Sequence, residues 1–171
     1  MGGKIEVSSR HGIGSAFTVE IPLLIAEQVM TEKEENLKKD MDLHGLHVLL
    51  AEDNDLNAEI AVALLEEQGM IVTRTDDGKS ALAQFCDTAP GTFDLILMDI
   101  MMPEMSGYET TKAIRNLPER PDGKEIPVIA MTANAFAEDV QAALNAGMDD
   151  HVAKPIDMEI LLSVITKYIE R

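Results

Sequence analysis

The sequence predicts an open, doubly wound α/β domain built on a five-stranded parallel sheet. Two observations support this fold class. From Leu46 to the end of the chain, five short apolar runs alternate with five longer segments of helical periodicity. The apolar runs are nearly continuous, which is typical of strands that are covered on both faces by helices. Such alternation favours parallel strands joined by crossover helices.

The predicted strands are short runs of Leu, Ile, Val and Met that are bounded by polar or turn residues. The most apolar run ends on a carboxylate, Asp99, and Pro103 follows shortly after it. The expected strands cover residues 46–52, 70–74, 93–98, 126–132 and 151–153.

The segments between these runs show helical periodicity. In the first of them, Ile60, Leu64 and Leu65 recur on one face, and Gly69 is placed to end the helix. Gly147 is placed to end the fourth helix in the same way. The expected helices cover residues 56–68, 78–86, 107–116, 135–147 and 157–170.

The amino-terminal segment, residues 1–23, predicts a β-hairpin. The runs 4–8 and 16–21 alternate polar and apolar residues, and Gly12 and Gly14 lie in the turn between them. An isolated two-stranded hairpin is only marginally stable in water. We therefore expect this hairpin to end a larger domain or to pack on the rest of the chain.

A charged segment separates the hairpin from the α/β domain. The stretch 31-TEKEENLKKD-40 is almost entirely charged or polar, which fits a linker or a solvated helix. The sequence therefore predicts a hairpin over residues 1–23, a linker over 24–45 and an α/β domain over 46–171.

Composition excludes several classes of function. The net charge of −17 disfavours nucleic acid and anionic membranes as partners. No apolar run approaches the ~18 residues of a membrane span, so we expect no direct membrane contact by this chain. The single cysteine, Cys86, cannot form an internal disulfide, and no signal peptide is visible. These features predict a reducing, cytoplasmic location.

Polar side chains follow the predicted strands at the point where each strand ends. Glu52 and Asp53 follow the first strand, Asp99 the third, Thr132 the fourth and Lys154 the fifth. Each residue alone has a commoner structural explanation, such as a turn or a helix cap. The carboxyl ends of parallel strands meet at one edge of a sheet, however, so we expect these five side chains to share one crevice.

This set of groups suits phosphoryl chemistry. Two carboxylates about 4 Å apart repel by about 4 kcal/mol at an effective dielectric constant near 20, and one lysine offsets only part of that repulsion. A hard divalent cation such as Mg²⁺ (or Mn²⁺) would relieve the remainder. A hydroxyl and an ammonium suit phosphoryl oxygens. Asp99, on the middle strand, is the candidate nucleophile that would form an aspartyl phosphate.

Residues 46–170 resemble the receiver domain of two-component signalling. The resemblance implies a flavodoxin-like fold with strand order 2-1-3-4-5 and a phosphoryl group accepted by Asp99 with the help of Mg²⁺. The motifs that carry it are 50-LAEDNDLN-57, 95-LILMDIMMPEMSGYE-109, 129-IAMTAN-134 and 147-GMDDHVAKPID-157.

The resemblance also implies a role for each site residue. Glu52 and Asp53 would form the acid pair of the metal site, and Mg²⁺ would be contacted by Asp53, Asp99 and the backbone carbonyl of Met101. Thr132 and Lys154 would hold the phosphoryl group.

Further positions follow from the same resemblance. Thr132 and His151 would form the conformational switch, and the Lys154–Pro155 bond would be cis. Ala133 and Asn134 would follow Thr132 at the rim of the site. Met101 and Asn134 occupy positions that tune the attack of water on the acyl phosphate. Because an apolar Met gives water no hydrogen-bond partner, we expect a long-lived phosphorylated form.

The hairpin segment 2-GGKIEVSSRHGIGSAFTVEIPL-23 resembles the last strands of a histidine-kinase ATP-binding domain, including its final glycine box at 12–14. The order of kinase tail, linker and receiver implies a hybrid histidine kinase, whose parent protein could be membrane-anchored. The kinase core is missing from the sequence. Whether the chain counts as an enzyme stays open, since it would catalyse only the phosphorylation and dephosphorylation of its own aspartate.

The expected partners are a phosphohistidine of the kinase core and a histidine phosphotransfer protein that docks near Leu56, Asn57 and Ile60. A weak homodimer is also compatible with the sequence. Two alternatives remain open. One is a haloacid-dehalogenase-like phosphatase, although Met101 occupies the place where that class has a second acid. The other is an interaction module that has the fold but is not phosphorylated.

Overall fold

The computed structural model describes residues 3–10, 12, 14–20, 43–133 and 137–169. The chain divides into two compact units, residues 1–38 and 39–171. Most of the predicted linker, residues 24–42, lies outside the described residues.

The first unit contains a β-hairpin, as the alternating pattern predicts. Strands β1 (Lys4–Arg10) and β2 (Gly14–Glu20) pair in antiparallel register, with Ile5 opposite Val19 and Val7 opposite Phe17. Because side chains alternate along a strand, these four apolar residues share one face, and each of them is exposed. The hairpin therefore presents an apolar face, as a piece of a larger sheet would.

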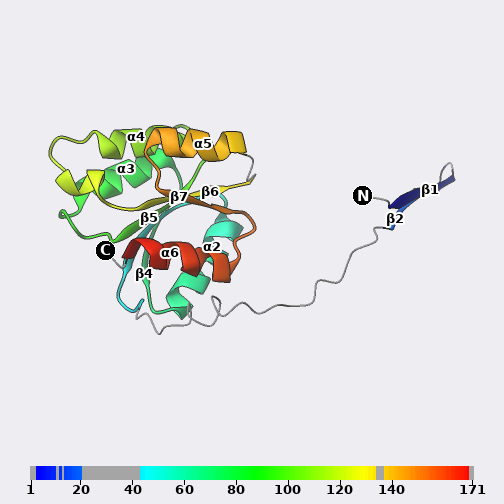
Figure 1. Cartoon of the computed structure of the whole chain (residues 1–171), viewed down its shortest axis with the longest axis horizontal. Coiled ribbons are helices and arrows are strands. Elements are labelled where there is room, and N and C mark those ends of the chain that lie inside the picture. Colours follow the sequence, from blue (N-terminus) through cyan, green and yellow to red (C-terminus); the bar gives the residue numbers. More distant parts are fainter. Residues whose placement is uncertain (1–2, 11, 13, 21–42, 134–136, 170–171) are drawn as a thin grey trace. The chain divides into compact units, whose positions relative to one another are not determined.

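The second unit is the predicted α/β domain (Figure 1). Its five strands are all parallel and follow the order β4-β3-β5-β6-β7. Counted within this unit the order is 2-1-3-4-5, so the predicted fold class is confirmed. The strands are β3 (His47–Ala51), β4 (Ile71–Thr75), β5 (Leu95–Asp99), β6 (Val128–Thr132) and β7 (Asp150–Ala153).

Helices cover both faces of this sheet. In Figure 1, α3, α4 and α5 lie on one side of the strands, and α2 and α6 lie on the other. The short 3₁₀ helix η1 between α4 and β6 is an element that the sequence pattern did not predict. The helices are α2 (Asp55–Glu67), α3 (Gly78–Asp87), α4 (Gly107–Arg115), η1 (Pro121–Lys124), α5 (Ala137–Ala146) and α6 (Met158–Ile169).

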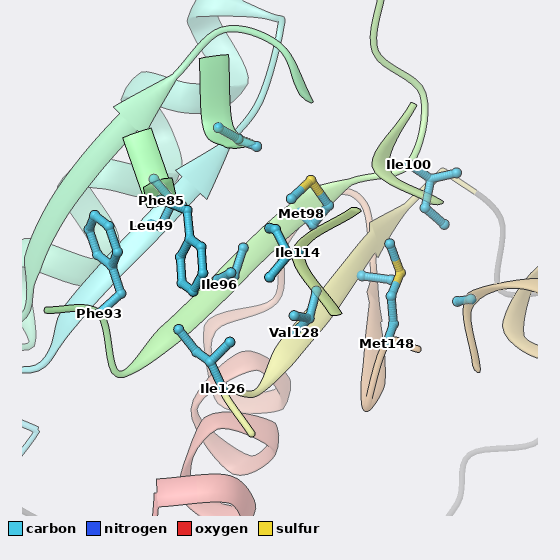
Figure 2. Close-up of a cluster of buried hydrophobic side chains, with 14 of the residues drawn as sticks. Leu49, Phe85, Phe93, Ile96, Met98, Ile100, Ile114, Ile126, Val128 and Met148 are labelled. Atoms are coloured by element: carbon cyan, nitrogen blue, oxygen red, sulfur yellow. The ribbon is translucent and has the colours of Figure 1, made fainter. Parts of the chain in front are cut away.

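Two apolar cores result from the alternation of side chains along the strands. On β5, Ile96 and Met98 point to the side of α3, α4 and α5, where Phe85 and Ile114 pack against them (Figure 2). Their neighbours Leu95 and Leu97 point to the opposite core, under α2 and α6. Every residue of β5 is buried, which explains why this strand has the most apolar sequence.

Most predicted elements differ from the structure by one or two residues at their ends, as β6 does in beginning at Val128 rather than residue 126. Strand β5 begins at Leu95 rather than residue 93, and just before it the carboxylate of Asp94 accepts a hydrogen bond from the backbone N–H of His47 (2.8 Å). On α2, Leu65 is buried, but Ile60, which was predicted on the same face, is 49% exposed. Ala61 occupies the core in its place, since the helix packs close to the sheet through small residues.

Salt bridges tie the amino ends of β6 and β7 to neighbouring elements. Four charged residues carry these contacts, and we call them the arginine cluster: Arg115, Arg120, Asp122 and Asp149. Arg115 Nη2 lies 2.7 Å from Asp149 Oδ2, which also accepts the backbone N–H of Val128 at 2.8 Å. Arg120 Nη2 lies 2.8 Å from Asp122 Oδ2, and its guanidinium stacks on the ring of Phe85. This cluster fixes η1 against the body of the domain.

Within the described residues, no helix is long and apolar enough to cross a membrane.

Candidate functional site

The five predicted site residues all lie at the carboxyl ends of strands. Glu52 and Asp53 follow β3, Asp99 ends β5, Thr132 ends β6, and Lys154 follows β7. These four strands are neighbours in one parallel sheet, so their carboxyl ends share an edge. The parallel topology therefore brings together residues that are about a hundred positions apart in the sequence.

One ammonium group bridges two buried carboxylates at this edge. Lys154 Nζ lies 2.5 Å from Glu52 Oε2 and 2.7 Å from Asp99 Oδ2. Glu52 is 1% exposed and Asp99 is 5% exposed, so neither carboxylate is well solvated. The other oxygen of Asp99 accepts the backbone N–H of Met101 at 3.2 Å. Thr132 is buried beside this pair of contacts, and its carbonyl accepts the backbone N–H of Lys154 at 2.7 Å.

Three carboxylates lie close enough together to hold one metal ion. One oxygen from each of Glu52, Asp53 and Asp99 can be chosen so that all three lie within 4.8 Å of one another. Asp53 is exposed, so the group opens to solvent on its side. Lys154 offsets only one of the three negative charges. A donor set of carboxylate oxygens with solvent access fits a hard divalent cation that keeps some of its water.

Burial and charge pairing act in opposite directions on these groups. Burial raises the pKa of the Asp99 carboxyl above its usual value, and the hydrogen bonds from Lys154 and Met101 offset this only in part. Burial also lowers the pKa of Lys154, but its hydrogen bonds to Asp99 and Glu52 outweigh burial and raise that pKa overall. The lysine therefore stays protonated, while the ionised form of Asp99 is held at a cost in free energy that a bound cation would reduce.

The loop after Asp99 turns sharply into α4. Glu104 adopts a left-handed conformation, with φ of 59°. A Cβ atom on Gly107 would lie 2.2 Å from the backbone oxygen of Asp99, so only glycine permits this close approach. Ser106 then begins α4 with a capping box that involves Glu109. This tight return explains why Pro103 and Gly107 follow the acidic strand end.

Further residues are predicted to lie around this site. The Lys154–Pro155 bond is cis, as predicted. His151 lies on β7, half-buried, beside a cavity of about 230 Å³ that is also lined by Val140 and Leu144 of α5. Asn134 lies outside the described residues. The roles expected for His151, Ala133 and the carbonyl of Met101 stay predictions.

Sequence reasoning did not place Asn57 in this site. It put Asn57 on a docking surface, but the side-chain amide Nδ2 donates to Glu52 Oε1 at 3.0 Å. The residue is in the first turn of α2, where Asn54 caps the helix by accepting the backbone N–H of Asn57 at 3.1 Å. Spacing alone does not reveal such a contact, because it depends on the direction in which the helix leaves the strand.

The sequence matches the family model described as the response regulator receiver domain, over residues 48–166. The aerobic respiration control sensor protein ArcB of Escherichia coli K12 is 40% identical over 169 residues, which are 98% of this chain and 21% of that protein. The chain thus spans about a fifth of the length of that relative.

Solved structures with the same fold include receiver domains. The receiver domain of sensor histidine kinase PA1611 from Pseudomonas aeruginosa PAO1, with a magnesium ion coordinated in its active site cleft, has a TM-score of 0.66 and 35% identity. The match covers 74% of this chain and 99% of the PA1611 receiver domain. A co-crystal structure of the Saccharomyces cerevisiae histidine phosphotransfer protein Ypd1 with the receiver domain of Ssk1 has a TM-score of 0.64 and 26% identity, covering 74% and 90%. The sequence match, the fold and the strand-end acids agree: this chain belongs to the response regulator receiver domain family.

Proposed function

We propose that this chain carries the receiver domain of a hybrid histidine kinase and that Asp99 accepts a phosphoryl group from a phosphohistidine. The observation that best supports this proposal is the shared contact of Lys154 with Glu52 and Asp99 at the carboxyl edge of the sheet. In that arrangement a buried carboxylate lies between a cation and two further acids. Such a carboxylate can attack phosphorus while the neighbouring groups balance the charge that develops.

The transfer itself is a displacement at phosphorus. An oxygen of Asp99 forms the new P–O bond, the P–N bond of the phosphohistidine breaks, and its electron pair stays on the imidazole ring. The ammonium of Lys154 would then contact a phosphoryl oxygen, which carries the negative charge, since an ammonium is a good partner for such an oxygen. The hydroxyl of Thr132 would hold a second phosphoryl oxygen.

Glu52, Asp53 and Asp99, together with the carbonyl of Met101, would hold Mg²⁺. The close approach of the three carboxylates supports this assignment, as does the magnesium ion in the related PA1611 receiver domain. When bound, the ion would neutralise charge on the phosphoryl oxygens. The three carboxylates would also lose most of their mutual repulsion.

The phosphoryl group would then pass to a histidine phosphotransfer protein. The complex of the related Ssk1 receiver domain with Ypd1 supports this kind of partner. On α2, beside the acids, Leu56 is 66% exposed and Ile60 is 49% exposed, so an apolar surface is available for docking. The alignment with ArcB covers 98% of this chain, so it includes the hairpin segment. We assign residues 1–23 to the end of a kinase ATP-binding domain and residues 24–45 to a linker.

Phosphorylation would be communicated through Thr132 and His151. A phosphoryl group on Asp99 would draw the hydroxyl of Thr132 toward it, and the space left behind would let His151 repack. The cavity of about 230 Å³ between α5, β7 and α6 gives the imidazole room to do so.

The direct test is to incubate the chain with a small acyl phosphate and Mg²⁺ and to measure its intact mass. We expect a gain of one phosphoryl group, which Asp99→Asn abolishes and Asp87→Asn, an exposed aspartate at the end of α3, does not. Absence of any gain would support the non-phosphorylated interaction module. Sustained release of phosphate from many small phosphate esters would instead support the phosphatase alternative.

A further inference from the structure

The buried carboxylate of Glu52 accepts a hydrogen bond on each of its two oxygens. Lys154 Nζ contacts Oε2 at 2.5 Å, and Asn57 Nδ2 donates to Oε1 at 3.0 Å. The side chain of Glu52 is 1% exposed, so water contributes little to holding it. A carboxylate in that environment depends on its protein donors for both its charge and its orientation.

The position of Asn57 is itself fixed from two sides. Its backbone N–H donates to the Asn54 side chain at the start of α2, and its own side chain reaches back to Glu52. On the same helix, Leu56 and Ile60 turn outward and are exposed. Asn57 therefore lies at the border between the acid site and the surface on which a partner is proposed to dock.

We propose that Asn57 is a positioning residue for the acid site, acting through Glu52. This inference rests on the proposed function of that site. With Asn57 in place, Glu52 shares its charge between an amide and an ammonium, so Lys154 can also contact Asp99. Without the amide, Lys154 carries more of the charge of Glu52 and is drawn away from Asp99, and the three carboxylates lose their common orientation.

This role differs in a measurable way from simple docking. A residue that only touches a partner affects transfer to and from that protein, and leaves the reaction with a small acyl phosphate unchanged. A residue that orients Glu52 affects Mg²⁺ binding and phosphorylation by a small donor when no partner protein is present.

The experiment compares Asn57→Leu, which has a similar size and no donor, with Glu66→Gln and Glu67→Gln, two exposed positions in the last turn of the same helix. Mg²⁺ affinity is measured by calorimetry on the full chain without a phosphodonor, and the initial rate is measured with a small acyl phosphate. We expect Asn57→Leu to weaken Mg²⁺ binding about tenfold, as is usual when a metal-binding side chain loses its hydrogen-bond partner. The two control variants should stay within about twofold of the wild type.

A double-mutant cycle tests whether Asn57 acts through Glu52. In a Glu52→Gln background, the change Asn57→Leu should alter Mg²⁺ affinity by less than about twofold. Equal losses in both backgrounds, or wild-type affinity in Asn57→Leu itself, would overturn the inference. Thermal unfolding without Mg²⁺ shows that each variant is folded. A wild-type chain that is not phosphorylated would instead contradict the proposed function, so the two failures are distinguishable.

Discussion

The two ends of the central sheet carry charged groups that are organised in opposite ways. At the carboxyl ends, the carboxylates of Glu52, Asp53 and Asp99 lie together, and one ammonium, that of Lys154, contacts Glu52 and Asp99. At the amino ends, the arginine cluster sets two guanidinium groups against two carboxylates. The first group is left with excess negative charge and the second is balanced.

The hydrogen bonds of the charged groups also differ between the two ends of the sheet. The guanidinium of Arg115 donates to the carbonyls of Gly147, Gly123 and Ile126 as well as to Asp149. Arg120 donates to the carbonyls of Phe85 and Thr88 and to Asp122. Both guanidinium groups are therefore hydrogen-bonded to backbone carbonyls and carboxylates of the domain itself. A balanced cluster bonded to the backbone therefore contributes to stability, whereas an unbalanced cluster at an open edge of the sheet is suited to bind a ligand.

The largest effect should come from breaking the balanced cluster. Replacing Arg115 with Met leaves Asp149 without its ion-pair partner and three backbone carbonyls without their donor. Because uncompensated groups in a largely buried pair are costly, we expect the free energy of unfolding to fall by about 3–5 kcal/mol. Urea denaturation measures this loss, and Lys112→Met, exposed on the same helix, is the control. A loss equal to that of the control would show that the cluster is not structural.

The unbalanced site should instead respond to its ligand. At 100 times its dissociation constant, Mg²⁺ should raise the free energy of unfolding by about 2.7 kcal/mol. Asp53→Ala should lose most of this gain, because one of the three carboxylates is missing, while Asp122→Asn should keep it. Thermal unfolding with and without Mg²⁺ gives the comparison. If Mg²⁺ stabilised all three proteins equally, the ion would be binding elsewhere.

The two clusters should also differ in their dependence on pH. The hydrogen bond from Arg120 lowers the pKa of Asp122 to about 2, from an ordinary value of 3.8. A lowered pKa means that the ionised form stabilises the fold above the ordinary pKa, and that this contribution is lost as pH falls toward 2. Asp122→Asn should therefore cost about 2 kcal/mol at pH 7. The difference from the wild type should shrink steadily below pH 4 in urea titrations; a constant difference would contradict the assignment.

The smallest effect should have the opposite sign. Because burial raises the pKa of Asp99, its ionised form opposes folding at neutral pH, and this penalty disappears once pH falls below the ordinary value. Asp99→Asn should therefore stabilise the metal-free chain slightly at pH 7. Chemical denaturation without Mg²⁺ measures the change, with Asp87→Asn as the exposed control. A destabilised Asp99→Asn protein would mean that the contact with Lys154 outweighs burial.

Local patterns were sufficient to predict the strands and the residues at their ends. An apolar run followed by a polar residue is a feature of adjacent positions, and parallel topology then places Asp99 and Lys154 at the same edge. The strand boundaries were predicted less well. Asp94 was predicted to lie in a strand, but it lies just before β5, where its side chain accepts a hydrogen bond from the backbone N–H of His47. The 3₁₀ helix η1 was missed because its stability depends on Arg120, whose partner carbonyl at Phe85 is 35 positions away.

The α/β fold, the strand-end acids and the lysine that follows the last strand could all be predicted from local sequence patterns. The donor that each carboxylate receives could not: Asn57 turns inward to Glu52, and Arg115 turns from the end of its helix to the amino ends of β6 and β7. Periodicity and strand ends are encoded in neighbouring residues, whereas a hydrogen bond of about 3 Å depends on how separate elements approach one another in space.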